Sequence, residues 1–316
     1  MNVRFFYFFL KTSKLKMDEC VIKALKESLS SNMINIKEFD LSKMKRDATV
    51  CVIGPRRTGK SYLTRDIMYH HQNIPAGVVL SGTEKVDPFF KKFIPNSYIF
   101  EKYDQNYVQN LISSREEIIS KKDGRKDPSD NIFFIMDDMI SQCEDWKNDK
   151  TIKELFLNGR HYNILFILTM QYIKSIGPML RGNFDYVFLF KNKSQEERLK
   201  IFQSFVSSVI PSKNDFYKIF DVLTKDHCCM VIDFTTESNS IEDSIFWYKA
   251  SLDIEPFKVG GPDYWAIEDK YGYDQTSYNR SAIEMYQEIN SVMEDIERYG
   301  DKNTTYKLVI PKDYNN

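Results

Sequence analysis

The sequence predicts an α/β fold in which helices flank a mostly parallel central sheet. Short apolar segments that suit buried strands alternate with segments of helical periodicity, which favours a parallel sheet. A glycine-containing loop at residues 54–61 separates the first such strand from the first such helix. Polar side chains close two later apolar strands, at residues 137–138 and 171. Parallel strands present such groups together at one edge of a sheet.

Composition fits a globular protein. The chain has 316 residues, of which 42% are hydrophobic, enough for a sizeable core. No apolar run reaches the about 18 residues of a membrane span. The apolar cluster at 5–10 is interpreted as an extension or as a misplaced start, because either Met1 or Met17 can initiate the chain. The five cysteines show no metal-like spacing, which favours reduced thiols in a cytosol-like compartment.

Charge is unevenly distributed along the chain. Residues 1–232 contain 36 Lys and Arg against 28 Asp and Glu, whereas residues 233–301 contain 5 against 16. A mildly basic body with an acidic C-terminal segment suits a protein that handles a polyanion and screens part of its own surface. A solvated surface without a partner is the alternative that charge alone favours.

Residues 54–61, Gly-Pro-Arg-Arg-Thr-Gly-Lys-Ser, match the phosphate-loop pattern G-x-x-x-x-G-K-[ST]. A strand predicted at 49–53 precedes the loop and a helix from Lys60 to about His70 follows it, so backbone N–H groups can wrap a polyphosphate. Lys60 is expected to reach the β- and γ-phosphates, and the Ser61 hydroxyl to ligate Mg²⁺. Gly54 and Gly59 are expected to supply backbone conformations that a Cβ would obstruct. The predicted nucleotide-binding residues are Gly54, Pro55, Arg56, Arg57, Thr58, Gly59, Lys60, Ser61 and Tyr62.

The remaining elements follow from periodicity and turn residues. Strands are predicted at 77–81, 98–100, 132–136, 163–170 and 186–190, and a closing hairpin or two added edge strands at 228–234 and 245–249. Helices are predicted at 19–29, 105–120, 151–158, from Ser194 onward, at 212–223 and at 279–298. Gly260-Gly261-Pro262 is typical of a linker. The predicted organisation is an N-terminal extension at 1–44, a nucleotide-binding domain at 45–255, and an acidic, tyrosine-rich extension with one helix at 256–316.

Three polar residues at strand ends are the main catalytic candidates. Asp137 is expected to hold the Mg²⁺ shell, and Asp138 to orient or deprotonate the attacking water. Gln171 closes the 163–170 strand and is expected to contact the γ-phosphate or the water. The alternative for each is an ordinary polar residue where a strand meets a loop.

The order of loop strand, extra strand, Asp-Asp strand and glutamine strand describes a RecA-like, additional-strand phosphate-loop ATPase core. Small-molecule kinases of the phosphate-loop type more often have an arginine-rich lid, and the N-K-x-D motif of GTPases is missing from the sequence. The predicted reaction is therefore Mg²⁺-dependent ATP hydrolysis by in-line attack of water.

Five motifs in this order make a more specific pattern: the phosphate loop, Ser81-Gly82-Thr83-Glu84 before Pro88-Phe89-Phe90, Met136-Asp137-Asp138, Gly159-Arg160-His161 and Thr169-Met170-Gln171. Over about residues 45–250 the chain resembles the poxvirus-type genome-packaging ATPases of large nucleocytoplasmic DNA viruses, in the FtsK/HerA superfamily. The resemblance implies ATP-driven translocation of double-stranded DNA into a capsid by a ring of five or six copies. It also implies a place in the host cytoplasm at the virus factory and in the virion. The acidic segment at 233–301 is expected either to dock on a capsid or portal-side partner or to shield the basic core.

The chain departs from the wider superfamily, which usually has Asp-Glu where this chain has Asp137-Asp138. Either Asp138 acts from a shifted position or another acid, such as Glu84, assists. The resemblance further implies an arginine finger that acts on a neighbouring subunit. Arg160 is the first candidate and Arg181 the second, and an ordinary surface arginine is the alternative for both.

Two other functions remain open from the sequence. A nucleotide or polynucleotide kinase would share the phosphate loop but transfer the γ-phosphate to an acceptor. A nucleotide-gated assembly protein would use the loop as a switch with little turnover.

Overall fold

The computed structural model describes residues 35–122, 127, 130–173, 176–238 and 240–271. Contacts divide the chain into two units, Met1–Ile36 and Lys37–Asn316, and the elements described below all lie in the second. The helices predicted at 19–29 and 279–298 lie outside the described residues. Within the described residues, no helix is both long enough and apolar enough to span a membrane.

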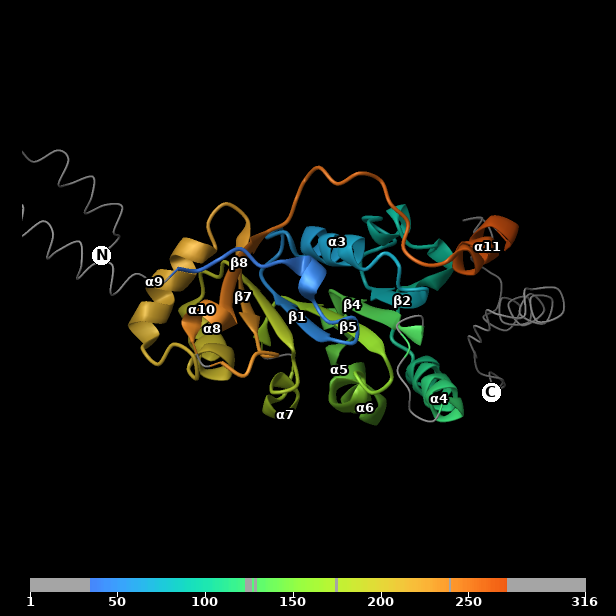
Figure 1. Cartoon of the computed structure of the whole chain (residues 1–316), viewed down its shortest axis with the longest axis horizontal. Helices are drawn as coiled ribbons and strands as arrows, with labels where there is room; N and C mark the ends of the chain where they lie inside the picture. Colours follow the sequence, from blue (N-terminus) through green and yellow to red (C-terminus); the bar gives the residue numbers. More distant parts are fainter. Residues whose placement is uncertain (1–34, 123–126, 128–129, 174–175, 239, 272–316) are drawn as a thin grey trace, which may run out of the picture. The chain divides into compact units, whose positions relative to one another are not determined.

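Eight strands of the described residues form one sheet in the order β3-β2-β4-β5-β1-β6-β7-β8 (Figure 1). Neighbours from β3 to β6 pair in parallel, and β7 and β8 close the sheet as antiparallel strands. The fold is therefore the predicted α/β fold with a mostly parallel sheet. The strands are β1 (Thr49–Ile53), β2 (Ala76–Ser81), β3 (Ile99–Phe100), β4 (Ile132–Asp137), β5 (Ile164–Met170), β6 (Tyr186–Phe190), β7 (Cys228–Asp233) and β8 (Ile245–Lys249).

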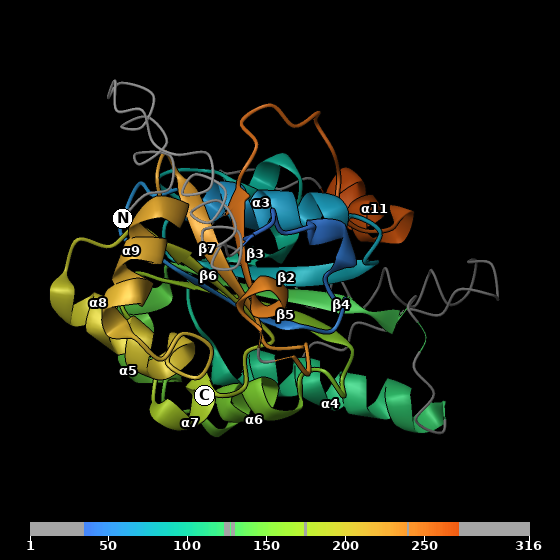
Figure 2. The ribbon, with the colours of Figure 1, turned by 60° about the vertical axis from the view of Figure 1, so that its left-hand side comes forward.

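Helices cover both faces of the sheet. In Figures 1 and 2, α3 lies over one face, and α4, α6 and α7 lie over the other. Side chains of Asp104, Asp149, Ser194 and Ser212 cap the N-termini of α4, α6, α8 and α9 by accepting backbone N–H bonds, which fixes where these helices begin. The α-helices are α3 (Lys60–His70), α4 (Gln105–Lys121), α5 (Cys143–Trp146), α6 (Lys150–Asn158), α7 (Pro178–Arg181), α8 (Gln195–Ile201), α9 (Lys213–Leu223), α10 (Ile241–Ser244) and α11 (Pro262–Tyr271).

Shorter helical turns connect these elements. The 3₁₀ turns are η1 (Leu41–Lys43), η2 (Phe90–Lys92), η3 (Asn96–Tyr98) and η5 (Met139–Gln142). A π-helical turn, η7 (Phe202–Val206), continues directly from α8.

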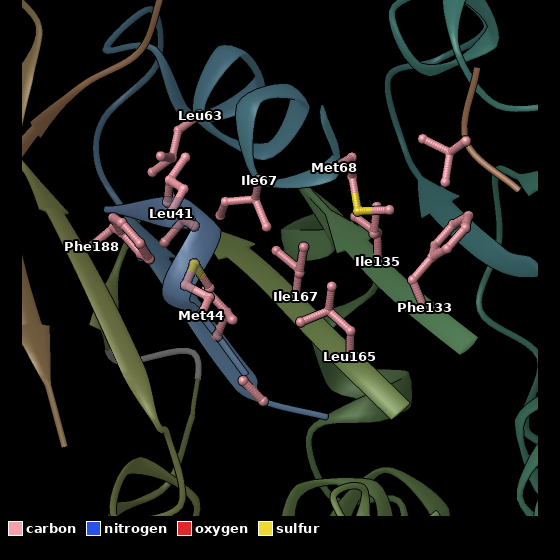
Figure 3. Packing of buried hydrophobic residues seen from close by; sticks show 14 of the residues in the cluster. Leu41, Met44, Leu63, Ile67, Met68, Phe133, Ile135, Leu165, Ile167 and Phe188 are labelled. Atoms are coloured by element: carbon pink, nitrogen blue, oxygen red, sulfur yellow. The ribbon is translucent and has the colours of Figure 1, made fainter. Parts of the chain in front are cut away.

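The main core lies between the sheet and α3. Leu63, Ile67 and Met68 of α3 are fully buried against alternate residues of the strands, as Figure 3 shows for Ile135 and Ile167. The intervening strand residues face the second helical layer, so the central strands are apolar on both sides. This burial anchors the strand ends and the start of α3, where the predicted site lies.

The segment from Ser251 to Tyr264 is bonded to the body of the second unit. The Gly260 N–H donates to the Gln72 carbonyl oxygen at 3.0 Å, and the Gly261 N–H donates to that of Pro75 at 2.8 Å. The Tyr264 hydroxyl donates to the Gly77 carbonyl oxygen at 2.7 Å. The glycine pair that suggests a linker is therefore hydrogen-bonded to the body of this unit, and the domain boundary at 255/256 stays a prediction.

A buried carboxylate ties this segment to α3. Asp66 is 1% exposed and accepts hydrogen bonds from the Tyr248 hydroxyl at 3.0 Å and the Ser251 N–H at 2.7 Å. It also pairs with Arg65 at 3.1 Å. A buried carboxylate is tolerated only when its oxygens are bonded in this way.

We expect Asp66→Ala to lower the free energy of unfolding by about 3 kcal/mol, because it removes the buried acceptor and leaves its donors without a partner. Urea denaturation followed by circular dichroism measures the change. Asp215→Ala is the matched control, since the pair between Asp215 and Lys218 is exposed and should contribute little. Equal stability of the Asp66 variant and the control would contradict this account.

Candidate active site

The loop at residues 54–59 leaves β1 at the carboxyl edge of the sheet and enters α3. Gly59 precedes the helix with a φ of 110°, a conformation that side-chain-bearing residues rarely adopt. A Cβ on Gly54 would lie 2.7 Å from both the Phe190 Cβ and the Thr58 Oγ1, so this position must be glycine for a steric reason. The Thr58 hydroxyl closes the loop by donating to the Pro55 carbonyl oxygen at 2.8 Å.

Lys60 folds back over the loop from the first turn of α3. Its Nζ donates to the carbonyl oxygens of Gly54 at 2.9 Å and Pro55 at 3.1 Å. Burial lowers the pKa of the Lys60 ammonium, and the negative charges of Asp138 and Asp137 oppose that shift. The ammonium is thus held within the electrostatic reach of both acids.

The other predicted nucleotide-binding residues lie in the loop or at the start of α3. Ser61 is half-buried at the start of α3, whereas Arg56 and Arg57 are exposed. Tyr62 is 42% exposed; its ring packs edge-on against Phe89 with the ring centres 5.6 Å apart. The nucleotide contacts of all these residues stay predictions.

The two acids and the glutamine meet at the ends of β4 and β5. Gln171 is buried, and its Nε2 donates to the Asp138 Oδ1 at 2.8 Å. The Thr169 hydroxyl donates to the Asp137 Oδ1 at 2.7 Å and accepts from the Asp138 N–H at 3.1 Å. Asp138 itself has a φ of 48°, which turns its carboxylate away from the direction that the strand would give it. The three residues predicted from strand ends therefore form one hydrogen-bonded cluster beside the loop.

Asp137 suits the predicted metal-binding role. Its side chain is buried, and burial raises the pKa of its carboxyl to about 6, against the lowering effects of the Thr169 hydrogen bond and the Lys60 charge. A carboxylate and the Ser61 hydroxyl are the hard oxygen ligands that Mg²⁺ prefers, and this ion takes its other ligands from phosphates and water. The residues present therefore fit the ion.

The raised pKa of Asp137 predicts a pH dependence of stability. Because the folded state holds its proton up to about pH 6 and the unfolded state releases it near pH 4, the unfolding free energy falls as pH rises through this window. Asp137→Asn does not titrate, so we expect its stability relative to the wild type to rise by about 2 kcal/mol between about pH 4.5 and pH 7 without Mg²⁺. Denaturation at the two pH values measures this; a constant difference would contradict it.

Glu84 is engaged elsewhere. Its carboxylate accepts N–H bonds from Phe89, Phe90 and Lys91, all at 3.0–3.1 Å. It is 7% exposed, and its backbone donors lie at the start of η2. With both oxygens occupied by backbone donors, Glu84 is poorly placed to activate water, which favours Asp138 between the two alternatives.

Arg160 is not brought to the loop of its own chain. It is exposed in the turn before β5, and its charge acts on Asp185, whose carboxylate accepts the N–H of Thr49 at the start of β1 at 2.8 Å. Arg160 therefore lies at the amino edge of the sheet, while the loop lies at the carboxyl edge, roughly 17 Å away along the five residues of β1. Any contact with a γ-phosphate would have to be made in a neighbouring subunit.

Arg181 is half-buried on α7 and holds nearby loops together. Its guanidinium donates to the Ile176 carbonyl oxygen at 3.0 Å, the Ser204 hydroxyl at 3.1 Å and the Ile173 carbonyl oxygen at 3.3 Å. These bonds favour a structural role over that of a finger.

Two residues near the site have no predicted role from the sequence. Thr169 bridges the two acids; its signal is a hydroxyl in an otherwise apolar, fully buried strand. His227 has a φ of 64°, and its Nδ1 lies 3.4 Å from the Thr58 carbonyl oxygen. No local pattern in the sequence indicates that the turn before β7 reaches the loop.

Together, the mostly parallel sheet, the glycine loop with its lysine after β1, and the acids at the end of β4, which β5 separates from β1, define a phosphate-loop fold of the additional-strand type. No family model matches the chain. It is, however, 35% identical over 249 residues to the uncharacterized protein L437 of Acanthamoeba polyphaga mimivirus, covering 77% of this chain and 86% of that one. It is 31% identical over 252 residues to the uncharacterized protein 088R of Invertebrate iridescent virus 3, covering 78% and 93%.

The chain therefore belongs to a protein family of large DNA viruses, the kind of virus that the motifs predicted. Among solved structures, it is similar to the DNA-packaging ATPase B204 from Sulfolobus Turreted Icosahedral Virus, with a TM-score of 0.48, 18% identity, and coverage of 66% of this chain and 100% of that one. It is also similar to EssC from Geobacillus thermodenitrificans, with a TM-score of 0.40, 15% identity, and coverage of 51% and 34%.

Proposed function

We propose that the protein hydrolyses ATP and uses the energy to move double-stranded DNA into a viral capsid. The observation that carries this proposal is the convergence of Lys60, Asp137, Asp138 and Gln171 at one edge of the sheet. Membership of a family of large DNA viruses and the set of five motifs support the packaging role.

The chain's own residues divide the work in this proposal. Residues 54–59 bind the phosphates through backbone N–H groups, and Lys60 pairs with the β- and γ-phosphate oxygens. Ser61 and Asp137 hold Mg²⁺, which when bound neutralises charge on the phosphates. Asp138 orients the water and accepts its proton, and Gln171, already bonded to that carboxylate, links the state of the γ-phosphate to β5.

A steady-state ATPase assay with and without linear double-stranded DNA tests this function. We expect DNA to raise turnover, and the stimulation to fall steeply between about 50 mM and 200 mM salt, because phosphate contacts release counterions. An ATP turnover rate that is the same with and without DNA at low salt would contradict the proposed translocation. Transfer of labelled γ-phosphate to an acceptor in place of water would indicate a kinase, and binding without turnover an assembly switch.

We further propose a ring of five or six copies in which Arg160 acts on the neighbour's γ-phosphate. Its exposed position at the amino edge supports action between subunits. Mixing Arg160→Ala with Asp138→Asn subunits should restore part of the activity that each lacks, because some interfaces then combine an intact Arg160 with an intact Asp138. Arg46→Ala, at the same edge of the sheet, is the control and should keep activity. No recovery in rings whose mixing is verified by light scattering and mass spectrometry would contradict action in trans.

We also propose that the protein works at the virus factory in the host cytoplasm and in the virion. Its acidic C-terminal segment is proposed to dock on a capsid or portal-side partner or to screen the basic body. Deleting residues 272–316 spares Tyr264 and its bond to Gly77. Unchanged assembly, DNA stimulation and capsid association in that deletion would contradict both roles for residues 272–316.

A further inference from the structure

Thr169 is the one residue of the cluster that touches both acids. It is 2% exposed and lies one residue before the end of β5, beside the end of β4. Its single hydroxyl donates to the Asp137 Oδ1 at 2.7 Å and accepts from the Asp138 N–H at 3.1 Å. Both hydrogen-bonding functions of the hydroxyl are therefore used, and each fixes a different acid.

The two bonds have different consequences. The bond to Oδ1 fixes the rotation of the Asp137 carboxylate, so that Oδ2 is the oxygen left for a cation. The bond from the Asp138 N–H holds that residue where its φ is 48°, a conformation that costs free energy for residues other than glycine and is less unfavourable for Asp and Asn. Gln171, two residues further along, holds the other end of Asp138 through its side chain.

We propose that Thr169 is a positioning residue for the paired acids, which orients Asp137 toward the metal ion and locks the backbone of Asp138 toward the water. This inference rests on the proposed ATPase function. It adds that the end of β5 sets the geometry of the end of β4 through two residues, Thr169 at the backbone and at Asp137, and Gln171 at the carboxylate of Asp138. A displacement of Gln171 and the end of β5 would then shift both acids.

Binding of Mn²⁺ together with a non-hydrolysable ATP analogue, followed by electron paramagnetic resonance, tests the proposal without requiring turnover. Thr169→Val keeps the shape of the side chain but removes the hydroxyl, and it should weaken Mn²⁺ binding by about tenfold, the loss expected for one hydrogen bond to a charged group. Thr169→Ser keeps the hydroxyl and should restore binding. Affinity for the analogue in EDTA, which depends on the loop, should stay within about twofold of the wild type in both variants.

A double-mutant cycle separates positioning from packing. In an Asp137→Asn background, Thr169→Val should cause no further loss of Mn²⁺ affinity, because the carboxylate through which it acts is gone. In turnover, Thr169→Val should lower kcat and leave the KM for ATP nearly unchanged. The inference is overturned if Thr169→Val binds Mn²⁺ like the wild type, if its loss persists in the Asp137→Asn background, or if Thr169→Ser is as impaired as Thr169→Val. A wild type that binds Mn²⁺ and the analogue but never hydrolyses ATP would instead count against the proposed function.

Discussion

Lys60→Ala is expected to abolish nucleotide binding at micromolar concentrations. The Lys60 ammonium donates hydrogen bonds to the carbonyl oxygens of Gly54 and Pro55 in the loop. There its charge can pair with two phosphates. Two charge-assisted hydrogen bonds together contribute at least about 3 kcal/mol, so affinity should fall by more than about 100-fold. Titration with a fluorescent ATP analogue measures the loss.

Two comparisons make the Lys60 experiment specific. Lys218→Ala removes an exposed lysine of α9 that is 68% accessible and should bind nucleotide like the wild type. Thermal unfolding of both variants shows whether removing the bonds to the loop carbonyls has disturbed the fold. A folded Lys60→Ala protein that binds ATP within about threefold of the wild type would mean that the phosphates lie elsewhere, against the phosphate-loop assignment.

Asp138→Asn is expected to bind ATP normally and to hydrolyse it about 100-fold to 10,000-fold more slowly, the range that a general base contributes. Asparagine can keep the left-handed backbone that Asp138 adopts, and its side-chain oxygen can still accept the Gln171 hydrogen bond. The substitution therefore removes basicity with little change of shape, whereas alanine would also add strain. Single-turnover hydrolysis, measured at saturating ATP, isolates the chemical step.

Asp215→Asn, in an exposed pair on α9, controls for the loss of one negative charge and should leave hydrolysis unchanged. Normal hydrolysis by Asp138→Asn would show that another group activates the water. Glu84 is a poor substitute, because backbone N–H groups occupy both of its carboxylate oxygens.

Much of the fold could be predicted because its signals are local. Thr49–Ile53 reads as a strand from five apolar or β-branched residues, and residues 105–120 read as a helix from periodicity; the structure has β1 and α4 there. Other features depend on contacts distant in sequence. The segment around Gly260 donates hydrogen bonds to Gln72 and Pro75, and no local pattern in the sequence distinguishes such a segment from a linker.

The features of the site also fall into those that local sequence predicts and those that depend on contacts distant in sequence. Lys60, Asp137, Asp138 and Gln171 could be predicted because each stands where a parallel strand or the loop delivers a side chain to the carboxyl edge. The left-handed backbone of Asp138 and the two hydrogen bonds of the Thr169 hydroxyl could not be predicted, because they arise from the register of β4 against β5. The amino-edge position of Arg160 does follow from its place before a strand, and it restricts the proposed finger to a neighbouring subunit.

Displacement of a triplex-forming strand from linear double-stranded DNA tests the central proposal most directly, because only a protein that moves along the duplex ejects the third strand. The oligomeric state should be measured on the same material. We predict displacement that requires ATP, is lost in Lys60→Ala and Asp138→Asn, and slows as salt rises. Assembled protein that hydrolyses ATP, binds the duplex and leaves the triplex in place would contradict the proposal that this ATPase moves DNA.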